Sequence, residues 1–125
     1  MFGLSKKNKK YPPFNALKLS PDKNKFFVRT CQWRWLNKNS IIVSDKHQPR
    51  VITLDPWPQL VFLAAKGDKT ISEFIFYMAT KYADKIPDEL DSTILEEIRT
   101  LLSEKIIELT DQKIKLSKDI LKPLL

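Results

Sequence analysis

The sequence predicts an α+β fold of winged helix-turn-helix type: a three-stranded antiparallel N-terminal sheet, then three helices and a C-terminal β wing. Three observations carry this prediction. Residues 26–54 hold short runs of β-branched and aromatic residues broken by turns, the apolar period becomes helical after Asp55, and two short apolar runs flank a turn near residue 111. The chain has 125 residues, which suits one domain.

The predicted sheet contains three strands in sequence order. Residues 26–36, FFVRTCQWRWL, place a cysteine and two tryptophans on one face at period two, with polar residues on the other. Residues 41–43 and 51–54 are two further short apolar runs, separated by polar loops. Sequential strands with short connections favour an antiparallel meander.

Capping signals place the three helices. Asp55 is the expected N-cap of the first helix, which ends near Gly67 as a left-handed cap. This helix is apolar on almost every side, so we expect it to be deeply buried. Thr70 and Glu73 have the spacing of a capping box for the second helix, and Asp91 is the expected cap of the third.

A turn late in the chain predicts the wing. Residues 106–109 and 113–116 flank Asp111-Gln112, so we expect them to pair as a hairpin. The expected organisation is a flexible basic tail (1–13), one winged-helix domain (14–116) and a C-terminal tail or last helical turn (117–125).

Charge is unevenly distributed along the chain. Residues 1–50 hold 12 Lys and Arg against 2 acids, whereas residues 51–125 hold 10 against 13, which gives the net +7. A basic first half suits an acidic partner, or it is a solvated tail that aids solubility. The sequence shows neither a secretory signal nor an apolar run long enough to span a bilayer, and it has a single cysteine. We therefore expect a cytoplasmic protein.

Catalytic and metal-binding patterns are missing from the sequence. His47 lies in a polar loop without a second metal-type ligand nearby, and Cys31 sits inside a strand as a small core residue would. Gly3 and Gly67 are the only glycines, so a glycine-rich phosphate loop is excluded. We predict a protein that is not an enzyme and has no catalytic residue, no metal and no cofactor.

The charge of the third helix disfavours DNA recognition by that helix. It carries Glu96, Glu97 and Glu104 against Arg99 and Lys105, and a phosphate-lined groove would repel it. Strand aromatics that stack on bases, or basic residues of the wing and tail, would still allow contact with nucleic acid. Such aromatics more often belong to the core. A winged-helix nucleic-acid-binding protein is therefore the alternative function rather than the first.

Two stretches of the sequence resemble one known family. They are VITLDPWPQLVFLAAKGDKTISEF and DELDSTILEEIRTLLSEKIIEL, and with the preceding strands the resemblance covers residues 26–109. The chain resembles the PqqD-like family, named for pyrroloquinoline-quinone biosynthesis protein D. The resemblance lies in apolar spacing. Pro56 and Pro58 within the first helix, the lysine tail and the segment after Leu109 depart from the family pattern.

The resemblance implies a peptide chaperone, also called a RiPP recognition element. Such a domain binds the leader of a ribosomally made precursor peptide and presents it to a modifying enzyme, often a radical-SAM protein. The leader adds as a strand to the N-terminal sheet beside the third helix, a mode that exposed strand edges support. The implied peptide-binding residues are Val51, Ile52, Thr53 and Leu54 at the edge and Ile94, Leu95, Ile98, Arg99 and Leu102 on the helix.

Two further interpretations of these residues remain open. At least half of the helix residues are expected to be plain core, whereas Arg99 is charged and suited to an acidic leader residue. A scaffold or homodimer that uses the same open edge on itself is the third hypothesis, after leader binding and nucleic-acid binding.

Overall fold

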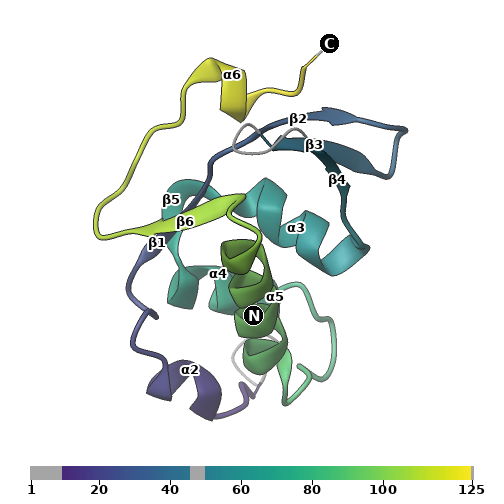
Figure 1. Cartoon of the computed structure of the whole chain (residues 1–125). Coiled ribbons are helices and arrows are strands. Elements are labelled where there is room, and N and C mark those ends of the chain that lie inside the picture. Colours follow the sequence, from purple (N-terminus) through teal and green to yellow (C-terminus); the bar gives the residue numbers. More distant parts are fainter. Residues whose placement is uncertain (1–9, 46–49, 125) are drawn as a thin grey trace, which may run out of the picture.

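The computed structural model describes residues 10–45 and 50–124 and contains two small antiparallel sheets with helices around them (Figure 1). The sheets have the strand orders β5-β1-β6 and β2-β3-β4. The α+β prediction is therefore confirmed. The elements are α2 (Asn15–Leu19), β1 (Phe26–Arg29), β2 (Gln32–Trp35), β3 (Ile41–Asp45), β4 (Arg50–Thr53), α3 (Pro56–Ala64), β5 (Lys66–Thr70), α4 (Ile71–Ala79), α5 (Leu90–Ser103), β6 (Ile107–Thr110) and α6 (Lys118–Leu121).

The β2-β3-β4 sheet is the predicted antiparallel meander. Trp33 pairs with Val43, which in turn pairs with Ile52 on the other side. These three residues share one face of the sheet because facing residues of neighbouring strands point the same way. Trp33 and Val43 are buried there, while Ile52 packs against the edge of the core.

The first predicted strand is in fact two strands in two different sheets. Residues 26–29 form β1 and residues 32–35 form β2, with Thr30 and Cys31 between them. At the break the backbone N–H of Arg29 donates to Ala65 and that of Thr30 donates to Ile106, which turns the chain from one sheet into the other. Period two cannot reveal such a break, because alternation continues across it.

The predicted wing hairpin is wrong. Residues 107–110 do form a strand, β6, but its partner is β1, with Phe26 opposite Thr110 and Arg29 opposite Ile107. Residues 113–116 form no strand. Burial explains why β6 pairs with β1 and not with residues 113–116. Strand β1 is largely buried, whereas the sequence KIKL at 113–116 alternates lysines with apolar residues and stays mostly exposed.

The helices follow the prediction with three corrections. The capping box is confirmed, because Thr70 Oγ1 accepts the Glu73 N–H and the Glu73 carboxylate accepts the Thr70 N–H. The first helix, α3, ends at Ala64, and Gly67 lies within β5 with φ +78° rather than capping it. Asp55 occupies the N-cap position of α3 without a side-chain cap hydrogen bond.

Asp91 is not the N-cap of α5, which begins one residue earlier. Its side chain is buried and accepts the backbone N–H of Leu17 at 3.0 Å. That bond holds α2, a short helix that the sequence analysis did not predict, against α5. A carboxylate near a helix N-terminus is also favoured by the helix dipole.

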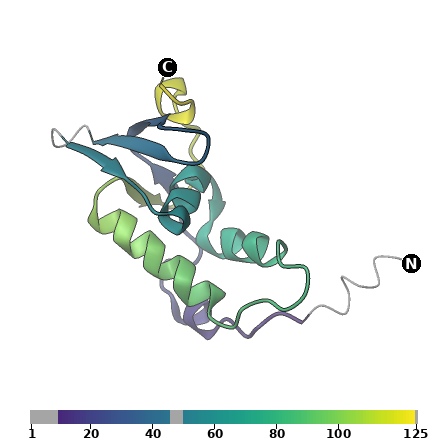
Figure 2. The same cartoon turned by 90° about the vertical axis from the view of Figure 1, so that its right-hand side faces the viewer.

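The core lies between the two sheets and the three longer helices, with α3 between the β2-β3-β4 sheet and the pair α4 and α5 (Figure 2). The prediction that α3 is buried on nearly all sides is only partly right, since Phe62 is fully buried but Leu60 is 41% exposed. The largest fully buried side chains are Phe27, Phe62, Phe74, Ile41, Ile71, Ile75, Leu90, Ile94, Leu101 and Ile106.

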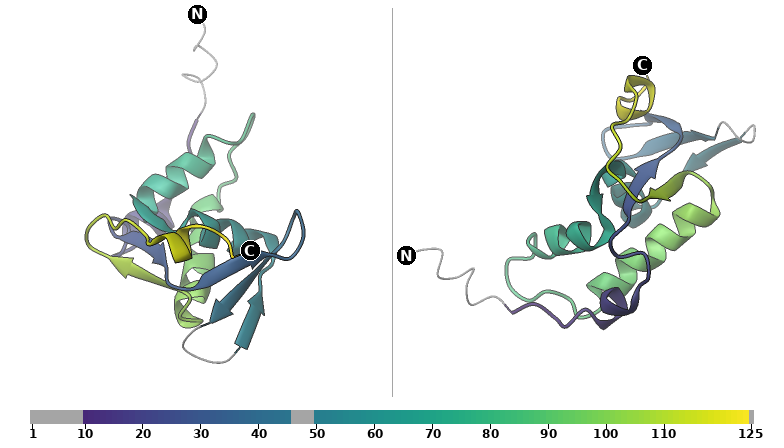
Figure 3. Two further views of the ribbon diagram at one scale, coloured as in Figure 1. Left: turned by 90° about the horizontal axis from the view of Figure 1, so that it is seen from above. Right: turned by 90° about the vertical axis from the view of Figure 1, so that its left-hand side faces the viewer.

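Both expected tails contain residues that contact the folded domain. Of the expected N-terminal tail, residues 1–9 lie outside the described residues, while the Tyr11 ring lies 5.9 Å from that of Phe76. Phe14 is buried. At the other end, residues 118–121 form the short helix α6, which lies beside β2 (Figures 1 and 3).

Candidate functional site

The candidate site begins at β4, which is an edge strand. Among the described residues, β3 is the only strand that pairs with it. Its side chains alternate, so that Val51 and Thr53 are exposed, whereas Ile52 is half-buried against the core; the fourth predicted edge residue, Leu54, follows the end of the strand and is also half-buried. Val51 alone leaves 64% of its surface exposed. Within the described part of the chain, β4 therefore lies at an edge of its sheet.

An ion-pair network fixes the start of β4. The Arg50 guanidinium donates to Asp45 Oδ2 at 2.6 Å, to Glu104 Oε1 at 2.8 Å and to the Glu104 carbonyl at 2.9 Å. These bonds raise the pKa of Arg50, with Glu104 as the larger cause and Asp45 as the second. The network joins the end of β3 and the start of β4 to the C-terminal end of α5, so these bonds hold the edge strand against that helix.

The opposite edge of the same sheet is occupied by the chain's own C-terminal segment. Leu124 donates its backbone N–H to the Trp33 carbonyl at 2.7 Å, and Trp33 Nε1 donates to the Ile120 carbonyl at 2.9 Å. Leu124 thus takes the place of a strand partner for β2. Residues 120–124 cover one edge of the sheet, at β2. At the other edge, no described strand pairs with the outer side of β4.

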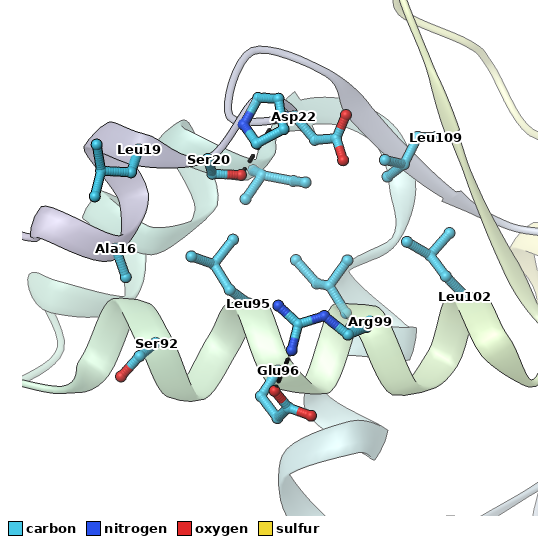
Figure 4. Close-up of a pocket in the computed structure, with 13 residues that line it drawn as sticks. Ala16, Leu19, Ser20, Asp22, Ser92, Leu95, Glu96, Arg99, Leu102 and Leu109 are labelled. Carbon is cyan, nitrogen blue, oxygen red and sulfur yellow. Dashed lines mark hydrogen bonds and ion pairs between the residues drawn. The ribbon is translucent and has the colours of Figure 1, made fainter.

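The helix residues predicted for the site divide into two groups. Ile94 and Ile98 are 0% and 3% exposed and belong to the core. Leu95, Arg99 and Leu102 instead line a groove between α5 and α2, where Arg99 pairs with Glu96 (Figure 4). The groove has a volume of about 430 Å³, and Ile98 also reaches its lining.

The α2–α5 groove and the β4 edge lie on opposite sides of α5. Leu95 and Glu104 are nine residues apart, or about two and a half helical turns, which places them on opposite faces. Glu104 is the residue that contacts β4, through Arg50. The structure therefore does not bring Leu95, Arg99 and Leu102 together with residues 51–54 in one groove.

The helix face nearest β4 is acidic instead. Glu97 lies two turns before Glu104 and so shares its face. Asp45, Arg50 and Glu104 were not predicted as site residues. A signal was present for the first two, because Asp45 and Arg50 are opposite charges at the two ends of a loop that joins adjacent strands, and they pair across the ladder. Nothing in the local sequence points to Glu104.

The described residues show no sign of a metal centre. No group of three or more His, Cys, Asp or Glu side chains among them lies close enough to hold a metal ion. Cys31 is a buried free thiol, and His47 lies outside the described residues. Within the described part of the chain, no helix has the length and apolar character needed to cross a membrane.

Comparisons of this chain with protein-family models, with curated proteins and with solved structures found no match.

Proposed function

We propose that this chain is a peptide-binding adaptor that holds an extended segment of another polypeptide as an added strand at β4. The observation that carries the proposal is that the two edges of the β2-β3-β4 sheet differ in how they are covered. Residues 120–124 cover β2, whereas β4 has only β3 as a described strand partner. Proteins usually protect long open edges because such edges pair with other chains, so an edge left open beside a covered one is suited to a ligand.

The resemblance to PqqD-like proteins supports the choice of ligand. In that family the ligand is the leader of a precursor peptide, and the recipient is a modifying enzyme. Strand addition also suits the length of β4, because an extended peptide would gain a few main-chain hydrogen bonds of about 0.5–1.5 kcal/mol each. Side-chain contacts must supply the rest of the affinity and all of the selectivity.

The geometry changes the expected side-chain contacts. A peptide beside β4 would meet the face of α5 that carries Glu97 and Glu104, whereas Arg99 lies on the far side and pairs with Glu96. The proposal therefore favours a leader with a basic residue next to its strand segment. Arg99→Glu should then have little effect on binding, and Glu97→Lys should weaken it.

The first test is hydrogen exchange of the backbone amides with and without the candidate precursor peptide. We expect the outward-facing amides of residues 50–54 to exchange quickly in the free protein and slowly in the complex. Protection confined to the α2–α5 groove, with none along β4, would overturn strand addition at this edge. A sedimentation experiment on the free protein separates peptide binding from self-association through the same edge.

A proline scan of β4 supplies the matched control. Neighbouring amides in a strand point in opposite directions, so Val51 and Thr53 share one direction and Ile52 has the other. Proline at the position whose N–H faces outward should abolish a peptide hydrogen bond and leave the fold intact. Proline at the position facing β3 should destabilise the sheet. Equal loss of binding at all three positions with the fold intact would contradict the model of directional backbone pairing.

A further inference from the structure

A second surface, remote from β4, gathers five lysines around one exposed tyrosine. It comprises Lys66 and Lys69 of β5, Tyr77 and Lys81 at α4, and Lys113 and Lys115 of the segment after β6; we call it the basic face. The elements that carry it lie on the side seen in the right-hand view of Figure 3. It is independent of the proposed peptide site, because none of its residues belongs to β4 or to α5.

A backbone contact brings the two lysine-bearing segments together. Ile114 donates its N–H to the Gly67 carbonyl at 3.0 Å, and a Cβ at Gly67 would lie 2.7 Å from the Ile114 carbonyl oxygen. Glycine therefore permits the close approach. As a result Lys66, Lys113 and Lys115 surround one hollow of about 390 Å³, and among the described residues that line it Asp68 is the only acidic one.

The positive charge continues from this hollow to Tyr77. The Lys81 Nζ lies 4.6 Å and the Lys69 Nζ 5.3 Å from the centroid of the tyrosine ring, and 44% of Tyr77 is exposed. The pKa of Tyr77 is lowered, first by a hydrogen bond to Lys81, then by the charge of Lys81 and, more weakly, by Lys69 and Lys66. Asp68 lies 3.7 Å from Lys69 and offsets part of that charge.

We propose that the basic face binds single-stranded nucleic acid, with its lysines along the phosphates and Tyr77 stacked on a base. Two features favour this partner. The lysines are spread over two extended segments and a helix end, which suits a chain of phosphates better than a single anion. An exposed ring among cations is also the pairing that sequence-tolerant binding of unpaired bases uses. A duplex would hide its bases from the ring.

The test measures binding of a fluorescein-labelled oligothymidylate of about 15 nucleotides by anisotropy across a salt series. Lys66→Gln with Lys113→Gln should weaken binding and reduce the slope of log K against log salt by about 1.4, since each lost phosphate contact contributes about 0.7 for single strands. The matched control is Lys18→Gln with Lys38→Gln, which removes the same charge from exposed positions on α2 and the β2–β3 turn. All variants retain the lysine-rich first ten residues, so any contribution of this segment to oligonucleotide binding and to its salt dependence is the same in each.

Tyr77 provides the second readout. Tyr77→Phe should bind like the wild type because the ring remains, whereas Tyr77→Ser should bind about fivefold or more weakly. Equal weakening by the two lysine pairs, or no difference between Phe and Ser at position 77, would overturn the proposal. So would binding to vesicles that contain about one-third phosphatidylserine with no binding to the oligonucleotide, which would assign the face to an anionic membrane.

Discussion

At the scale of single residues, Arg29 has the least ordinary environment in the described structure. It is 3% exposed, and its guanidinium donates to four main-chain carbonyls, those of Phe62, Leu63, Ile120 and Leu121. Two of these carbonyls belong to the last turn of α3, where a cation is favoured by the helix dipole. Burial lowers the pKa of Arg29 to about 10, so it remains charged at neutral pH.

Replacing Arg29 should therefore be costly. Arg29→Met leaves the α3 carbonyls and the C-terminal segment without their shared donor, and we expect a loss of about 2–4 kcal/mol in the free energy of unfolding by urea. Arg29→Lys should recover only part of it, since an ammonium lacks the planar fork. Arg34→Met, on the exposed face of β2, is the control and should change stability by less than about 0.5 kcal/mol. Equal losses at both positions would contradict this role.

The pair Lys25–Asp111 makes a pH-dependent contact between the segment before β1 and the turn after β6. Lys25 Nζ lies 2.6 Å from Asp111 Oδ1, and this hydrogen bond, followed by the charge of Lys25, lowers the pKa of Asp111 below 3.8. Because the folded value is depressed, the stabilisation is present above the unfolded pKa and is lost as pH falls through the folded one.

An NMR titration of the Asp111 carboxylate measures this effect. We expect a midpoint below the ordinary value of an aspartate in the wild type and a return toward that value in Lys25→Met. The control is Lys23→Met, which also removes one lysine charge but two residues away from Lys25. In this variant the midpoint of Asp111 should stay lowered. A midpoint that is the same in all three proteins would show that the ion pair does not form in solution.

At the scale of elements, the sequence predicted each strand or helix best where its signal was local. The capping box at Thr70 and the apolar stripe of α5 needed only neighbouring residues, and both are as expected. The partner of β6 was predicted less well, because β1 and residues 113–116 compete to pair with it and lie far apart in sequence. Apolar burial decides that competition, and a nearby turn does not reveal it.

The same reasoning explains why the candidate site was only partly foreseen. Residues 51–54 were recognised as an edge, because a meander's last strand is an edge unless something covers it. Their helix partners were chosen from the apolar stripe, but a stripe says which residues are apolar and not which neighbour each one faces. Leu95 and Leu102 belong to the stripe and line the α2–α5 groove, and α2 is an element without a sequence signal of its own.

Helix α3 offers a direct test of the packing. Phe62 is 0% exposed at the centre of the core, so Phe62→Ala should cost roughly 3–5 kcal/mol in urea unfolding. Leu60→Ala, two residues earlier in the same helix and 41% exposed, should cost less than about 1 kcal/mol. Similar costs for the two variants would mean that α3 does not face the core as described.

At the scale of the whole molecule, the C-terminal segment acts as a cover for β2. Deleting residues 117–125 would free the β2 edge and remove the carbonyls that hold Arg29 and Trp33. We expect the truncated protein to associate at concentrations where the full chain is monomeric, and its tryptophan emission to shift to longer wavelength. The control is a chain in which Lys118 and Lys122 are changed to Ala, which keeps the backbone contacts. Unchanged association and emission would rule out a covering role.

The central place of β1 determines the order in which this chain can complete its fold. The partners of β1 are β5 and β6, so Phe26 can complete its pairing only after Thr70 and Thr110 have been synthesised. The β2-β3-β4 meander needs only neighbouring residues and can form while synthesis continues. Sheets closed by distant residues assemble slowly. During synthesis, therefore, the strand FFVR can pair with β5 only once residue 70 has emerged and with β6 only once residue 110 has emerged, and the interval before that is when it is most exposed to aggregation.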